Sequence, residues 1–282
     1  MLTPLVHANG AAIPAIGLGT WPMKGEEAAR AVARALETGY RAVDTAAMYG
    51  NEDAVGEGLR AAGVPRADIF VTTKVWYTDL APSALQRSAE ASLKRLGLDQ
   101  VDLLLIHWPN PDIPLEGSIA ALCDAKRHGL ARHVGVSNFP VALLDRAVSL
   151  ATEPLVANQC EYHPHLDQTK LLAACRRHGL AFLSYAPIGK GAVLEDAAVR
   201  AVAARHGRTA AQVVLRWHVQ QDGVAAIPKS ANPQRIAENL DVFGFTLSEE
   251  DMRAVWPRAA RRSHGRARVV AKLGSLTACR SP

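Results

Sequence analysis

The chain has 282 residues, of which 49% are hydrophobic and 21% charged, the ordinary balance of a globular protein with a large core. Its formal net charge is +5, but residues 257–282 contain seven Lys or Arg and no Asp or Glu, so residues 1–256 are slightly acidic. The charge pattern therefore does not support nucleic-acid binding by the folded part. The sequence has no run of about 18 uninterrupted apolar residues, which argues against a membrane span.

The start of the chain, Met1–Pro4, has neither a charged stretch nor an apolar run after it. We therefore predict no secretory signal and a cytoplasmic location. The four cysteines lie far apart, without C-x-x-C spacing, at Cys123, Cys160, Cys175 and Cys279. This spacing favours reduced thiols over a disulfide framework.

The first predicted element is a β-hairpin over Leu5–Ile13, because apolar segments flank Asn9-Gly10, a pair typical of a type I′ turn. After it, short apolar runs alternate with longer stretches of helical spacing. The predicted strands are Ile16–Leu18, Ala42–Val43, Ile69–Val71, Val101–Ile106, Val134–Val136, Leu155–Ala157, Leu180–Leu183 and Val224–Ile227. Predicted helices between them include Glu26–Thr38, Ser83–Leu96, Ser118–His128 and Thr169–His178. Helix-stop glycines follow at Gly39, Gly97, Gly129 and Gly179.

Strands that alternate with helices pair in parallel through right-handed crossovers, and eight of them point to a closed barrel. We predict a single (β/α)₈ TIM barrel whose N-terminal hairpin closes the bottom. No linker or low-complexity tract interrupts residues 1–256, which we assign to one domain. The basic segment 257–282 has no helical stripe and is expected to be a mobile, exposed tail.

Reactive groups of such barrels come from the C-terminal ends of the strands. Seven of the eight predicted strands are followed by residues that can donate, accept or ionise: Asp44, Lys74, His107, Ser137-Asn138, Gln159, Tyr185 and Lys229. One such residue is easily explained as a buried polar group satisfied by its own loop. Seven in register are harder to explain by packing, because each needs hydrogen-bond partners once buried.

Three of these residues occur with Tyr49 at a particular spacing. Asp44 ends the second strand, Tyr49 follows five residues later, and Lys74 and His107 end the third and fourth strands. Further motifs are Val136–Phe139, Asn158-Gln159, Ser184-Tyr185, Ile227–Ser230, Arg235 and Glu238-Asn239. In these motifs, over about residues 4–255, the sequence resembles the aldo-keto reductase family. It looks closest to the bacterial branch that includes 2,5-diketogluconate and methylglyoxal reductases.

The chemistry of carbonyl reduction suits these residues. It needs a hydride donor and a proton for the developing alkoxide, and a free Tyr, with a pKa of about 10, is a weak acid at neutral pH. A nearby Lys74 would lower the pKa of Tyr49, Asp44 would keep Lys74 charged, and His107 would orient the carbonyl oxygen. We therefore predict an NADP-dependent oxidoreductase with Asp44, Tyr49, Lys74 and His107 as catalytic residues and Tyr49 as proton donor.

The expected cofactor site is not a Rossmann fingerprint, since Pro22 stands where the third glycine after Gly17-Leu18-Gly19 belongs. The resemblance implies an extended dinucleotide. Its carboxamide would contact Ser137, Asn138 and Gln159, and its nicotinamide ring would stack on Tyr185. The loop Pro187–Gly191 would cover the pyrophosphate, and Lys229, Ser230 and Arg235 would surround a 2′-phosphate, which favours NADPH over NADH. The full predicted set is Thr20, Asp44, Ser137, Asn138, Gln159, Tyr185, Pro187, Ile188, Gly189, Gly191, Ile227, Lys229, Ser230, Arg235, Glu238 and Asn239.

The predicted substrate pocket is aromatic, and its walls are assigned to Trp21, Met48, Trp76, His107 and Trp108. Such a lining suits small apolar or dicarbonyl compounds. We expect a monomer that acts on small molecules. No metal is predicted: Glu161, His163 and His165 alternate as zinc ligands can, but Pro164 disrupts regular strand geometry and no second cluster supports a site.

Two other functions compete with this prediction. A class I aldolase would use Lys74 or Lys229 as a Schiff base but leaves Tyr49 without a role. A barrel that binds cofactor without catalysis does not explain the complete set of four residues.

From Trp256-Pro257 the chain also departs from the family, whose members carry here a loop over the pocket. A divergent functional tail and a shifted reading frame both explain this departure, and we favour the second.

Overall fold

The computed structural model describes residues 3–256. The expectations for the basic segment 257–282, which includes Cys279, lie outside the described residues. Cys123, Cys160 and Cys175 are buried free thiols, as their spacing predicted. In the described part of the chain, no helix is long and apolar enough to cross a membrane.

The N-terminal hairpin consists of β1 (Leu5–Ala8) and β2 (Ala11–Pro14), which pair antiparallel. Asn9 and Gly10 both have positive φ, 43° and 88°, as a type I′ turn requires. The side-chain amide of Asn9 donates to the carbonyl oxygens of Leu155 and His178, at 2.7 and 3.0 Å. Leu155 begins β8 and His178 lies in the turn that leads into β9, so the hairpin closes the N-terminal end of the barrel, as predicted.

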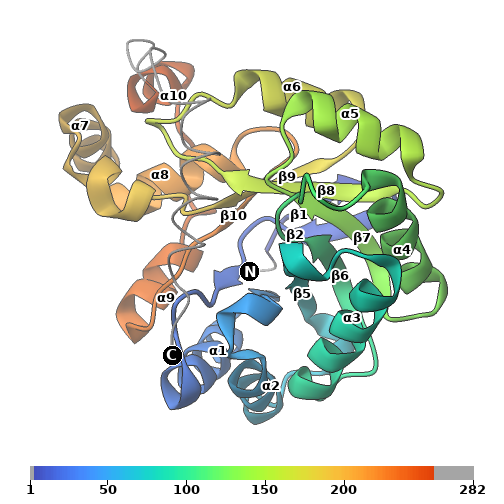
Figure 1. The fold of residues 1–282 in the computed structure, drawn as a ribbon. Helices are drawn as coiled ribbons and strands as arrows, with labels where there is room; N and C mark the ends of the chain where they lie inside the picture. The colour runs from blue at the N-terminus through green and yellow to red at the C-terminus, as the bar shows by residue number, and fades with distance from the viewer. Residues whose placement is uncertain (1–2, 257–282) are drawn as a thin grey trace.

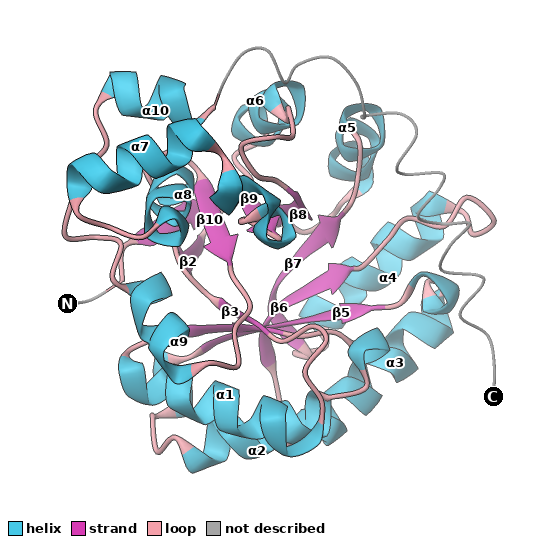
Figure 2. Ribbon diagram, turned by 90° about the vertical axis from the view of Figure 1, so that its left-hand side faces the viewer, coloured by secondary structure: helices cyan, strands magenta, loops and turns pink. Residues whose placement is uncertain are grey.

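Eight parallel strands form the barrel, and each pairs with the next one along the chain. They are β3 (Leu18–Gly19), β4 (Ala42–Asp44), β5 (Phe70–Val75), β6 (Val101–Ile106), β7 (Ala131–Ser137), β8 (Leu155–Glu161), β9 (Ala181–Tyr185) and β10 (Val224–Ile227). A bridge between Ile16 and Ala226 joins the last strand to the segment before the first. Figures 1 and 2 show the strands side by side around a common centre. The predicted TIM barrel is confirmed.

Helices surround the strands on the outside (Figure 2). They are α1 (Gly25–Thr38), α2 (Glu52–Ala61), α3 (Pro82–Leu96), α4 (Leu115–Arg127), α5 (Val141–Leu150), α6 (Thr169–Arg177), α7 (Ala197–His206), α8 (Ala210–Val219), α9 (Pro233–Leu240) and α10 (Glu249–Val255). Gly39 and Gly97 end α1 and α3 in the left-handed conformation, with φ of 116° and 67°. Both act as the predicted helix stops.

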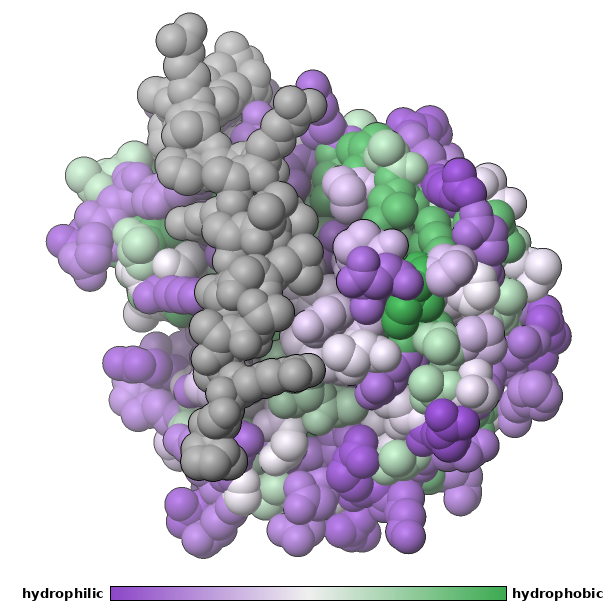
Figure 3. Space-filling view, in the orientation of Figure 1, coloured by the Kyte–Doolittle hydropathy of each residue, from purple (hydrophilic) through white to green (hydrophobic). Residues whose placement is uncertain are grey.

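Two hydrophobic layers stabilise the barrel. Inside it, Ile13 of the hairpin packs with strand residues such as Leu103, Leu105 and Leu183. A larger layer lies between the strands and the helices, with Val32 of α1 and Leu85 of α3 fully buried. On the face seen in Figure 3, hydrophilic residues line most of the margin, as expected for helices whose polar sides face water. Because the inner layer is hydrophobic, the interior of the barrel is apolar, and polar side chains gather at the mouth that the C-terminal ends of the strands form.

Several strands run beyond the apolar segments that predicted them. β5 reaches Val75 and β8 reaches Glu161, so Lys74 and Gln159 are strand residues. Lys74 keeps its register with Leu105, and Gln159 with Leu183. Backbone pairing thus continues while the side chains change from apolar to polar at the C-terminal mouth.

Candidate active site

A pocket of about 620 Å³ opens at the C-terminal ends of the strands. Most of the residues predicted for cofactor and substrate line it: Thr20, Trp21, Asp44, Met48, Tyr49, Trp76, His107, Trp108, Asn138, Gln159, Tyr185, Pro187, Ile188, Ile227 and Lys229. The other predicted residues are not among its lining: Lys74, Ser137, Gly189, Gly191, Ser230, Arg235, Glu238 and Asn239. Lys74 and Ser137 lie behind the lining, both with no exposed surface.

Lys74 is the centre of a buried ionic cluster. Its Nζ donates to Asp44 Oδ1 at 2.6 Å, to the carbonyl oxygen of Thr45 at 2.8 Å and to the hydroxyl of Tyr49 at 3.3 Å. Burial works to lower the pKa of Lys74, but the attraction of Asp44 and Tyr49 outweighs it and raises the pKa. Lys74 is therefore a fixed positive charge beside the Tyr49 hydroxyl.

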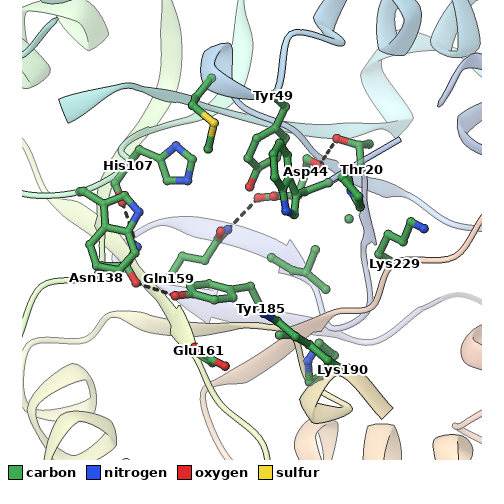
Figure 4. A pocket seen from close by; sticks show the side chains of 18 of the residues that line it. Thr20, Asp44, Tyr49, His107, Asn138, Gln159, Glu161, Tyr185, Lys190 and Lys229 are labelled. Carbon is green, nitrogen blue, oxygen red and sulfur yellow. Dashed lines mark hydrogen bonds between the residues drawn. The ribbon is translucent and has the colours of Figure 1, made fainter. Parts of the chain in front are cut away.

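Asp44 has a second partner that the sequence did not indicate. Its Oδ2 accepts a hydrogen bond of 2.7 Å from the side-chain amide of Gln159, drawn as a dashed line in Figure 4. Both carboxylate oxygens are thus held, one by Lys74 and one by Gln159, from β5 and β8. The carboxylate cannot turn away from Lys74 without losing one of these bonds.

Tyr49 lies in a short 3₁₀ turn (Ala47–Tyr49) that follows β4. Burial raises the pKa of its hydroxyl, and the positive charge of Lys74 only partly offsets this rise. The expected effect of Lys74 is thus present, but it is smaller than the effect of burial. The hydroxyl is protonated at neutral pH, and Lys74 stabilises the phenolate that would form when the proton leaves.

His107 lies close to Tyr49 at one end of the pocket (Figure 4). The two rings pack edge to face with their centroids 5.6 Å apart, and the rings of Trp76 and His107 pack in the same way with centroids 5.0 Å apart. Burial and, to a smaller extent, the charge of Lys74 hold the pKa of His107 well below its usual value. The imidazole is therefore neutral, and it can donate one N–H to an oxygen placed near Tyr49.

Asn138 and Tyr185 lie beside this cluster and are bonded to each other. The Tyr185 hydroxyl donates to Asn138 Oδ1 at 2.8 Å, and the Asn138 amide donates to the His107 carbonyl oxygen and to Ser137 Oγ, each at 3.0 Å. Asn138 has a φ of 63°, a conformation that asparagine tolerates better than most residues. These bonds fix the phenol ring of Tyr185 as one wall of the pocket.

At the other side of the pocket the charge is positive. Lys190 and Lys229 line it, away from His107 in Figure 4, and neither forms an ion pair within residues 3–256. Arg235 is exposed on α9, close in sequence to Ser230, whose hydroxyl accepts the Asn232 backbone N–H at 3.1 Å. Two unneutralised cations at one end of the pocket, with the flat ring of Tyr185 between them and His107 (Figure 4), fit an extended dinucleotide with phosphates and a planar base.

Several lining residues were not predicted. They are Gly19, Pro22, Glu161 and Ala186. Lys190, which also lines the pocket, was predicted only as part of the loop Pro187–Gly191, because that prediction used the glycines of the loop and not its charge. Glu161 and His163 approach to 3.8 Å, whereas His165 contacts Asp196 at 3.0 Å. Among the described residues, no group of three His, Cys, Asp or Glu is arranged to hold a metal ion.

The sequence matches the model of the aldo/keto reductase family over residues 15–256. The chain belongs to this family. Its members reduce carbonyl groups with nicotinamide cofactors, and the aldo-keto reductase resemblance is confirmed. Relatives include an aldo-keto reductase of Mycolicibacterium smegmatis, 47% identical over 241 residues and 85% of each chain. Morphine 6-dehydrogenase of Pseudomonas putida is 44% identical over 268 residues and 89% of each chain.

Solved structures give the same result. A protein provisionally named 2,5-diketo-D-gluconic acid reductase B superposes with a TM-score of 0.90 at 44% identity, covering 94% of this chain and 95% of that one. An aldo-keto reductase of Bombyx mori in complex with NADP superposes with a TM-score of 0.84 at 36% identity, covering 90% and 92%. The family of this chain therefore includes a member solved with NADP.

Proposed function

We propose that the protein reduces the carbonyl group of small aldehydes, ketones or dicarbonyls with NADPH, and that Tyr49 donates the proton. The observation that carries this proposal is the position of Lys74 Nζ, 2.6 Å from Asp44 and 3.3 Å from the Tyr49 hydroxyl. A fixed ammonium next to a phenol that faces an open pocket is the arrangement that proton donation to an alkoxide requires.

Each of the four catalytic residues has its own role in carbonyl reduction. NADPH, when bound, supplies the hydride to the carbonyl carbon. His107 donates a hydrogen bond to the carbonyl oxygen and turns it toward Tyr49, which holds the proton. Lys74 stabilises the phenolate as the proton leaves, and Asp44, fixed by Gln159, keeps Lys74 in place.

The cofactor contacts are part of the same proposal. Tyr185 would stack on the nicotinamide, and Asn138 and Gln159 would hold the carboxamide. Ser137, predicted together with them, is fully buried and would support Asn138, whose side-chain amide donates to the Ser137 hydroxyl at 3.0 Å. The phosphates would lie toward Lys190 and Lys229, and Ser230 with Arg235 would bind the 2′-phosphate, which would make NADPH the preferred cofactor. The remaining predicted contacts are Thr20, Asp44, Pro187, Ile188, Gly189, Gly191, Ile227, Glu238 and Asn239.

The substrate end of the pocket is apolar and aromatic. Trp21, Met48, Trp76 and Trp108 line it next to Tyr49 and His107, and Trp21 is 50% exposed at its edge. This lining supports small carbonyl compounds with apolar or flat groups as substrates. We further propose that residues 1–256 act as one domain and as a monomer.

The aldolase alternative is disfavoured by the state of Lys74. A Schiff-base lysine needs a lowered pKa and a free amine, whereas Asp44 and Tyr49 raise the pKa of Lys74 and three acceptors occupy its Nζ. Borohydride trapping with an aldehyde should therefore leave the mass of the protein unchanged.

The test is NADPH oxidation by the purified protein with methylglyoxal, diketogluconate, aromatic aldehydes and ketosteroids. Tyr49→Phe should reduce kcat at least about 100-fold, the lower range of general acid catalysis, and leave NADPH affinity nearly unchanged. A Tyr49→Phe variant with the kcat of the wild type would refute the assignment of the proton donor.

A further inference from the structure

The loop that follows β9 has an unusual backbone. Ala186 and Lys190 have φ of 48° and 55°, a left-handed conformation that side chains with a Cβ rarely adopt. Gly189 and Gly191 share the left-handed region, with φ of 55° and 95°. Non-glycine residues keep such a conformation only where the surrounding structure imposes it. Something beneath this loop therefore holds it in shape.

The support comes from two elements. Within the loop, the N–H groups of Gly189 and Gly191 donate to the carbonyl oxygens of Ala186 and Ile188, at 2.8 and 2.9 Å. From below, His218 of α8 lies 3.1 Å from the carbonyl oxygen of Pro187, measured from Nε2. This hydrogen bond ties the loop backbone to a helix that packs on the barrel.

The imidazole of His218 is held in place by aromatic neighbours. It is fully buried, and it meets the rings of Tyr162 and Trp217 edge to face at 5.2 and 4.8 Å. A carbonyl oxygen only accepts hydrogen bonds, so Nε2 carries the proton and Nδ1 is bare. Nδ1 is buried and has no hydrogen-bond partner within the described part of the chain.

A bare nitrogen in an apolar layer is costly, and an apolar side chain would fill the same space without that cost. The property that histidine offers here is a donor that reaches Pro187 from a buried helix face. Burial lowers the pKa of His218 to about 3, so the ring remains neutral and the donor is present at every pH at which the protein would work.

We propose that His218 is a positioning residue for the cofactor: by holding the Pro187 carbonyl it sets the loop that presents Lys190 to the phosphates. Ala186, Pro187, Ile188 and Lys190 all line the pocket, so a shift of the loop moves one whole side of it. The inference rests on the proposed function, because it takes this side of the pocket to be the phosphate side. His218 itself does not line the pocket.

The test compares two variants of the full-length protein. His218→Met removes the donor at similar volume, whereas His218→Gln keeps an amide N–H near the position of Nε2. In a fluorescence titration, His218→Met should weaken NADPH binding about three- to tenfold, the effect of one lost hydrogen bond. His218→Gln should stay within about twofold of the wild type, and the KM for the aldehyde should not change in either variant.

Trypsin gives a second readout that needs no cofactor. Lys190 is exposed, and cleavage after it can be followed by mass spectrometry on the unliganded protein. Cleavage at Lys190 should be faster in His218→Met and unchanged in His218→Gln. If His218→Met does not fold, His218→Asn replaces it, because the shorter amide does not reach Pro187.

Leu85→Ala is the control for a general loss of stability. Leu85 is fully buried on α3, which packs against β5, four strands away from β9. The inference is overturned if His218→Met weakens NADPH binding no more than Leu85→Ala, or if His218→Gln loses as much as His218→Met. If the wild type does not bind NADPH, the proposed function fails, and cleavage at Lys190 still decides whether His218 holds the loop.

Discussion

Replacing Lys74 by Met tests whether its charge acts through the Tyr49 hydroxyl. The two groups lie 3.3 Å apart. Two full charges at that separation attract by about 5 kcal/mol at an effective dielectric constant of about 20. If about half a negative charge has formed on the phenol oxygen in the transition state, Lys74 contributes about 2.5 kcal/mol. Lys74→Met should therefore lower kcat roughly 50- to 100-fold.

Removing Lys74 alone also leaves Asp44 as a buried carboxylate without its cation, which can cost about 3–5 kcal/mol of stability. The matched variant is Lys74→Met with Asp44→Asn, which removes both charges and keeps a polar partner for Gln159. Its urea midpoint should lie closer to that of the wild type, while kcat should stay as low as in Lys74→Met. This separates the catalytic loss from unfolding.

The assay is single-turnover reduction of an aldehyde at saturating NADPH, combined with Tyr49→Phe. Because Lys74 acts through Tyr49, the double variant Tyr49→Phe with Lys74→Met should be no slower than Tyr49→Phe alone. A further 50-fold loss in the double variant would refute the reasoning. So would a Lys74→Met variant that loses NADPH affinity but keeps its kcat.

Three further predictions concern binding and stability. Arg235→Ala should weaken NADPH binding by about 1.5–3 kcal/mol and barely change NADH binding, as measured by titration with each cofactor; equal losses would mean that Arg235 is structural. Asn9→Ala should lower the free energy of unfolding by about 2–3 kcal/mol, because it loses two hydrogen bonds and keeps a positive φ, while kcat stays unchanged. Burial lowers the pKa of His218 from 6.5 to about 3 in the folded protein. Below pH 6.5 the unfolded chain therefore binds a proton that the folded protein does not, and the free energy of unfolding falls by about 1.4 kcal/mol per pH unit until the pH nears 3. When the free energy of unfolding is measured with urea at pH 7 and at pH 5, it should fall less between the two pH values in His218→Gln than in the wild type. An equal fall in both proteins would contradict a buried, neutral His218.

The sequence predicted the parts of the fold that depend on local patterns. The turn at Asn9-Gly10 requires two positive φ angles, and few other residue pairs provide them. Gly39 and Gly97 ended their helices for the same reason. Strand ends were less accurate: the apolar run stopped at Val71, but β5 continues to Val75, because side chains at the barrel mouth become polar while the backbone stays paired.

Asp44, Lys74 and His107 could be placed together because parallel strands end at one rim, so chain order brings their side chains close. Tyr49 lies in the turn after β4, and its place beside them was predicted from the resemblance to the family. Partners across the barrel were beyond this reasoning. Gln159 donates to Asp44 over a separation of 115 residues, which only the closed barrel brings about. The net rise in the pKa of Tyr49 was missed for a related reason, since burial depends on the loops that cover the phenol.

Pro187 and His218 illustrate which residues are missed when a site is predicted only from the residues that follow each strand. Such a prediction finds the residues that face the pocket, but a loop with left-handed residues needs a support that faces away from it. His218 lies in the last turn of α8, among apolar neighbours, where the sequence alone suggests an ordinary core position. Its Nε2 lies 3.1 Å from the Pro187 carbonyl oxygen. This hydrogen bond, which only the structure shows, is the reason to assign His218 a role in supporting the loop and not only in filling the core. Residues of this kind are found by asking which buried donor meets the backbone of a strained loop.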